Sequence, residues 1–146
     1  HVSYERACSG SGLPNLYAFM KKRIPEPERL ARALAEVDDP NPVIVGEALS
    51  ADGCQLCQAT LDLFVAILGA EAGNMALRVL ARGGVFLGGG IPPRIVPALQ
   101  GPGFIQRDVA KGRLADVVAA MPVYIIMNPQ AGLLGAAAYG LASMED

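Results

Sequence analysis

Apolar residues recur at helical spacing through most of the chain. Ser3 is a good N-cap, and Glu5 falls in the first turn behind it. The pattern then predicts further helices over 13–23, 26–37, 42–49, 94–99, 104–110, 113–120 and 132–144. In the 13–23 helix one face carries Leu13, Leu16, Tyr17 and Met20.

A longer helix is predicted over 52–81, and its polar residues change face along its length. Gln55, Gln58 and Asp62 form one stripe, whereas Glu71, Asn74, Arg78 and Arg82 form another half a turn away. The stretch 63–70 between them is apolar all round. This helix therefore either passes through a core or bends at Gly69 or Gly73.

Two short continuous apolar runs predict strands buried on both faces. They cover 85–87 and the middle of 121–127. Two parallel strands do not make a stable sheet. The sequence therefore predicts that further strands come from elsewhere in a larger α/β fold.

Three glycines follow the first predicted strand. Gly88, Gly89 and Gly90 allow a sharp turn with no Cβ to hold a ligand away, and Pro92 or Pro93 suits the first turn of a helix. A nucleotide can lie on bare backbone at such a place. A purely structural turn remains the alternative.

Composition narrows the function classes. The 146 residues are 52% hydrophobic and 18% charged with a net charge of −2, which is typical of a globular domain. There is no basic footprint and no Trp, so we expect no nucleic-acid partner. The most apolar run, 63–70, is too short to span a bilayer, so we expect no membrane either.

The cysteines and the one histidine do not define a site. Cys8, Cys54 and Cys57 are too few for a disulfide framework and indicate reduced thiols in a cytoplasmic protein. The pair Cys54 and Cys57 has C-x-x-C spacing, but no predicted strand precedes it, and a zinc site would need Cys8 and His1 as well. We therefore expect no metal site. Because the chain starts at His1 rather than Met, we expect a fragment or a processed product.

A series of motifs along the whole chain resembles the C-terminal half of bacterial glucokinases. It begins with HVSYER at 1–6, CSGSGL at 8–13 and NLY at 15–17. It continues in order through the C-x-x-C, GN-x-AL at 73–77, GGVF at 83–86, GGI-x-PR at 89–94, PVY at 122–124 and GLLG at 132–135.

The resemblance implies a fold and an activity. The fold is the actin-like ATPase (ribonuclease H-like) α/β fold, with this chain as a C-terminal large-domain fragment carrying a helix-rich insertion. Residues 1–127 would belong to the large domain, and residues 128–146 would form a helix that packs on the small N-terminal domain. The family transfers the γ-phosphoryl group of ATP to the 6-hydroxyl of glucose with Mg²⁺.

The resemblance also assigns residues. Glu5 matches the glutamate that binds a glucose hydroxyl, and Gly88, Gly89 and Gly90 match the motif that packs on adenosine. The family's phosphate-binding turns and its catalytic aspartate have no counterpart here. We therefore expect no catalytic residue in this chain and no glucose phosphorylation by the chain alone. The full-length protein is expected to be a homodimer.

The apolar residues of the last helix should be exposed, because its predicted partner is missing. They are Leu133, Leu134, Ala137, Ala138 and Leu141.

Two alternative functions remain. One is a non-catalytic sugar- or nucleotide-sensing protein of the repressor–kinase family, which the lack of a Cys-rich zinc loop disfavours. The other is a structural domain whose glycines only make turns. The phosphoryl donor and the sugar range stay open.

Overall fold

One long helix, α4 (Gln55–Val79), forms the axis of the molecule in the computed structural model, which describes residues 3–144. It begins at Cys54, whose Sγ accepts a hydrogen bond from the Cys57 backbone N–H at 3.3 Å. It ends at Leu80, whose φ of 48° lies in the left-handed region. The polar stripes predicted from the sequence are exposed at the two ends, at Gln55 and at Arg78 for example, so the helix passes through a core.

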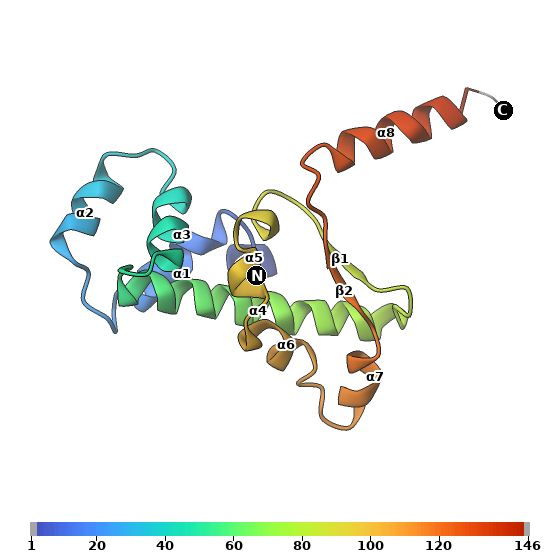
Figure 1. Cartoon of the computed structure of the whole chain (residues 1–146), viewed down its shortest axis with the longest axis horizontal. Helices are drawn as coiled ribbons and strands as arrows, with labels where there is room; N and C mark the ends of the chain where they lie inside the picture. Colours follow the sequence, from blue (N-terminus) through green and yellow to red (C-terminus); the bar gives the residue numbers. More distant parts are fainter. Residues whose placement is uncertain (1–2, 145–146) are drawn as a thin grey trace.

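Short helices surround α4 (Figure 1). Before it come η1 (Tyr4–Arg6), α1 (Gly12–Met20), α2 (Glu28–Ala35) and α3 (Asn41–Leu49), of which α1 and α3 pack directly on α4. After it come η2 (Pro92–Arg94), α5 (Val96–Leu99), α6 (Pro102–Asp108), η3 (Gly112–Leu114) and α7 (Ala115–Ala119). Each lies within a few residues of the range predicted from the sequence.

Glycines bring α6 unusually close to α4. A Cβ on Gly69 would lie 2.4 Å from the Phe104 carbonyl oxygen, and one on Gly73 would lie 2.1 Å from the Asp108 carbonyl oxygen. No side chain fits in either space. These two glycines therefore allow two helix backbones to touch. A bend of α4 at Gly69 or Gly73 is not needed to explain its two polar stripes.

The two strands, β1 (Val85–Leu87) and β2 (Val123–Ile125), pair in parallel. One face packs against the core through Leu87, which is buried. On the other face Phe86 and Tyr124 stack with ring centroids 5.0 Å apart and remain 62% and 46% exposed. The prediction that both strands are buried on both faces is therefore wrong, because nothing in the described part of the chain covers this outer face.

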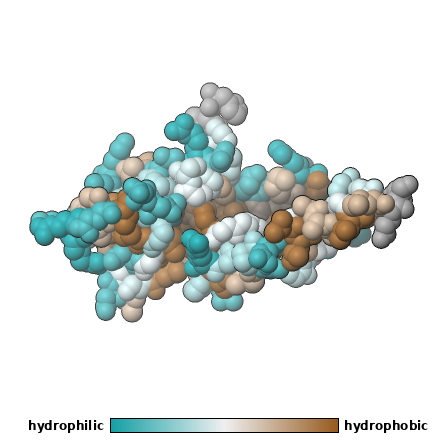
Figure 2. Space-filling model, turned by 90° about the horizontal axis from the view of Figure 1, so that it is seen from above, coloured by the Kyte–Doolittle hydropathy of each residue, from teal (hydrophilic) through white to brown (hydrophobic). Residues whose placement is uncertain are grey.

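The last helix, α8 (Ala131–Ala142), projects from the body as an arm (Figure 1). Leu133, Leu134 and Leu141 are 71%, 55% and 66% exposed, and no residue of the helix is buried. Apolar residues are therefore displayed along this end of the molecule (Figure 2). The prediction that this face is exposed is confirmed.

By length and composition alone, α4 is the one helix among residues 3–144 that could cross a membrane. Half of its most apolar window is buried inside the protein. Helices in the cores of water-soluble proteins pass the same test. The core here is built around α4, with Leu56, Cys57 and Phe64 among its buried residues.

Candidate functional site

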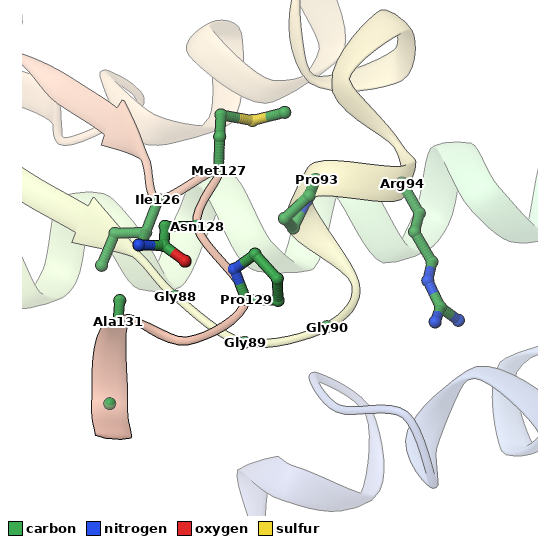
Figure 3. Close-up of a pocket in the computed structure, with 11 residues that line it drawn as sticks. Gly88, Gly89, Gly90, Pro93, Arg94, Ile126, Met127, Asn128, Pro129 and Ala131 are labelled. Atoms are coloured by element: carbon green, nitrogen blue, oxygen red, sulfur yellow. The ribbon is translucent and has the colours of Figure 1, made fainter. Parts of the chain in front are cut away.

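A groove lies at the carboxyl ends of the two strands. Because β1 and β2 are parallel, Gly88–Gly90 after β1 and Met127–Pro129 after β2 emerge at the same edge of the sheet. The groove has a volume of about 610 Å³. Its lining residues are Gly88, Gly89, Gly90, Pro93, Arg94, Ile126, Met127, Asn128, Pro129, Ala131 and Gly132 (Figure 3). We call it the strand-end groove.

The glycine loop presents bare backbone to this groove. A Cβ on Gly89 or Gly90 would meet nothing within 4 Å, and one on Gly88 would meet only the Ile126 Cδ1, at 3.5 Å. Gly89 also has a φ of 101°, which disfavours any other residue there. The positive φ of Gly89 sets the course of the loop, and the open space beside the glycines lets a ligand contact the peptide groups.

A second groove shares the glycine loop. It has a volume of about 400 Å³ and runs from Gly88–Gly90 to the turn between η1 and α1. Cys8, Ser9, Gly10, Phe64, Leu68, Ile91 and Pro92 complete its lining. We call it the loop groove. It joins two parts of the chain that lie about eighty residues apart in the sequence.

Glu5 lies in η1, directly before the turn that forms one wall of the loop groove, and does not itself line the groove. Its backbone N–H donates to the Ser3 Oγ at 3.3 Å, so Ser3 is the predicted N-cap. The Ser9 hydroxyl donates to the Glu5 carbonyl oxygen at 2.6 Å, and the Asn15 amide donates to the Arg6 carbonyl oxygen at 3.0 Å. The backbone is thus held in place, while the exposed Glu5 carboxylate has no hydrogen bond or ion pair within residues 3–144. It is free to bind a ligand.

The cysteines contribute to structure. Cys54 and Cys57 are buried reduced thiols at the start of α4, and no strand precedes them in the described part of the chain. Burial, and then the neighbouring Cys54 sulfur, raise the pKa of the Cys57 thiol, which disfavours the reactive thiolate. No cluster of three potential metal ligands occurs among the described residues, and His1 lies outside them.

The sequence indicates the glycines but not the other wall of the strand-end groove. No sequence pattern assigns a role to Arg94, Met127 or Asn128, although the apolar run before Asn128 predicts a strand. The parallel pairing of β1 with β2 brings the residue after each strand to one edge, and no local sequence pattern contains this pairing. Asn128 is held by its own turn, where its Oδ1 accepts the Gln130 backbone N–H at 2.9 Å.

The chain is similar to known glucokinases over nearly its whole length. The family model described as Glucokinase matches residues 1–143. A glucokinase of Yersinia pestis (strain Pestoides F) is 43% identical over 139 residues, and one of Nostoc punctiforme is 38% identical over 148 residues. These alignments cover 95% and 93% of this chain.

A solved glucokinase structure is also similar to this chain. The crystal structure of a glucokinase from an Antarctic psychrotroph superposes with a TM-score of 0.73 at 33% identity over 94% of this chain. The chain spans only about 40% of the length of that protein and 40–43% of the two curated relatives. Sequence and structure agree on one conclusion: the chain belongs to the glucokinase family.

Proposed function

We propose that this chain is the C-terminal, large-domain part of an ATP-dependent glucokinase with the actin-like ATPase fold. In that enzyme the γ-phosphoryl group of ATP is transferred to the 6-hydroxyl of glucose. Glu5 binds a glucose hydroxyl, and Gly88, Gly89 and Gly90 pack against adenosine. Family membership favours this enzyme over the repressor–kinase alternative.

The shared wall of the two grooves is the observation that supports the proposal best. The strand-end groove offers bare backbone to a nucleotide, and the loop groove leads from the same glycines to the turn behind Glu5. A donor and an acceptor bound in these grooves would lie next to each other. Phosphoryl transfer depends mainly on such alignment and on charge neutralisation.

The two implied cofactors fit this chain to different degrees. The open space at Gly89 and Gly90 suits close contact between backbone and a nucleotide. Mg²⁺ is usually bound by carboxylates together with the substrate phosphates, yet none of the described residues that line either groove carries a carboxylate. When bound, Mg²⁺ would neutralise phosphate charge, but its protein ligands would come from outside these grooves.

Two exposed surfaces would be covered in the whole enzyme. Residues 128–146 would pack through α8 on a small N-terminal domain, and residues 1–127 would belong to the large domain. The stacked rings of Phe86 and Tyr124 would lie beneath further parts of that domain. A homodimer in the cytoplasm remains our prediction for the full-length protein.

An activity assay of a chimera tests the proposal. We expect the 146-residue chain alone to show no ATP-dependent turnover of glucose, and turnover by it would contradict the assignment. A chimera with this chain in place of the matching segment of the Yersinia pestis glucokinase should phosphorylate glucose.

Glu5→Gln in that chimera should lower kcat/KM for glucose roughly 10- to 100-fold, because a charged hydrogen bond to the sugar is lost. Glu28→Gln is the matched control, since Glu28 lies on α2 and lines neither groove. A folded chimera without activity, or equal activity of the two variants, would overturn the proposal.

A further inference from the structure

Among residues 3–144, Arg94 is the only charged residue that lines the strand-end groove. The other lining residues are glycines, prolines, Ala131, aliphatic side chains and Asn128. A groove with apolar walls and a single cation suits a ligand that has a flat, weakly polar part and an anionic part. A nucleotide has this combination.

The guanidinium of Arg94 is available for such a ligand. The side chain is exposed, and its guanidinium makes no ion pair or hydrogen bond with any other residue of the described range 3–144. Figure 3 shows it extending from η2, beyond Gly90 and away from Asn128. In contrast, Arg29 and Arg32 are paired with Glu47 and Glu28.

The position of Arg94 indicates which part of the ligand it would meet. Its neighbour Pro92 lines the loop groove, and Ile91 touches the η1–α1 turn, with its Cδ1 3.8 Å from a Cβ placed on Gly10. Arg94 therefore lies where the strand-end groove adjoins the groove that leads toward Glu5. A nucleotide whose base occupies the strand-end groove must send its phosphates this way to reach a sugar held by Glu5.

We propose that Arg94 is a positioning residue that binds the phosphate chain of the donor nucleotide as it passes from the strand-end groove to the loop groove. This inference rests on the proposed function. A guanidinium is well suited to the role, because its fork of N–H donors pairs with phosphate oxygens in a fixed geometry. Arg94 would thus distinguish a nucleotide from a nucleoside.

Binding of three probes to the 146-residue chain by calorimetry at low salt tests this role. The probes are ATP, adenosine and inorganic tripolyphosphate. The wild-type chain should bind ATP more tightly than adenosine. Arg94→Gln should weaken ATP and tripolyphosphate binding about ten-fold and leave adenosine binding unchanged, whereas Arg94→Lys should retain part of the difference. Raising the salt concentration should reduce the wild-type preference for ATP.

Arg107→Gln is the matched control, because Arg107 is an exposed arginine of α6 that lines neither groove. Circular dichroism of the two glutamine variants verifies that both are folded. If Arg94→Gln binds ATP as tightly as Arg107→Gln does, the role of Arg94 is refuted and the nucleotide site stands. If the wild-type chain binds no adenosine, the proposed nucleotide site itself fails, and the role of Arg94 fails with it.

Discussion

At the scale of single residues, Asp108 is an exception to the packing of the core. Its side chain is 1% exposed at the end of α6, and its Oδ1 has no hydrogen-bond partner in the described structure. Lys111 supplies an opposing positive charge, but its Nζ donates to the Ala70 carbonyl oxygen at 2.8 Å. Burial therefore raises the pKa of the Asp108 carboxyl, and Lys111 only partly opposes this shift.

This raised pKa predicts a pH-dependent stability. The folded chain binds the Asp108 proton more tightly than the unfolded chain does, so stability falls as the pH rises from the ordinary value near 3.8 through the raised pKa. Asp108→Asn cannot ionise and should be more stable than wild type by about 1–3 kcal/mol at pH 8, with a smaller difference near pH 3. Urea unfolding at several pH values measures this difference. Asp116→Asn, on the exposed surface of α7, is the control, and a wild-type pH profile in Asp108→Asn would contradict the argument.

At the scale of elements, the seam between α4 and α6 depends on glycine. Gly73→Ala would place a Cβ 2.1 Å from the Asp108 carbonyl oxygen, so the two helices would have to separate. We expect a loss of about 1–3 kcal/mol in the free energy of unfolding. Gly46→Ala is a matched control within α3, where the added Cβ meets nothing within 4 Å, and it should stabilise the chain by about 0.5–1 kcal/mol. Urea unfolding distinguishes them, and equal effects of the two substitutions would refute the seam.

The elements also show how far the sequence alone could lead. The helices were predicted within a few residues because their 3.6-residue apolar period is a local property, as in α1 with Leu13, Leu16 and Tyr17 buried. The burial of the strands was predicted wrongly at Phe86 and Tyr124. What covers the face of a sheet depends on other elements, and no local pattern contains that information.

The residues of the candidate site also differ in whether the sequence alone can identify them. Gly88, Gly89 and Gly90 could be identified from the sequence because backbone freedom is a property of glycine itself. Arg94 and Asn128 could not, because they become neighbours of one groove only through the pairing of β1 with β2. The properties of single residues can be predicted from the sequence, but the approach of segments that lie far apart in the chain cannot.

At the scale of the whole molecule, apolar residues are buried in one part of the structure and exposed in another. Around α4 they form two buried clusters, whereas along α8 they face solvent. An amphipathic surface helix would keep a polar face, but α8 is made almost entirely of alanine, glycine and leucine. Such a helix can approach a neighbouring surface closely, which is consistent with the proposal that it packs on another part of a longer protein.

That proposal predicts two different outcomes for one pair of substitutions. Leu133→Ser with Leu141→Ser should change the free energy of unfolding of the 146-residue chain by no more than about 0.5 kcal/mol, because both side chains are exposed in it. In the chimera with the Yersinia pestis glucokinase the same pair should lower the free energy of unfolding by about 2–4 kcal/mol, because both side chains would then be buried. Phe104→Ala, which removes a side chain that is only 4% exposed, should destabilise both proteins and shows that the unfolding measurement is sensitive. An equally small effect of the serine pair in the chimera would mean that α8 remains exposed there, and the assignment of residues 128–146 to the domain interface would be wrong.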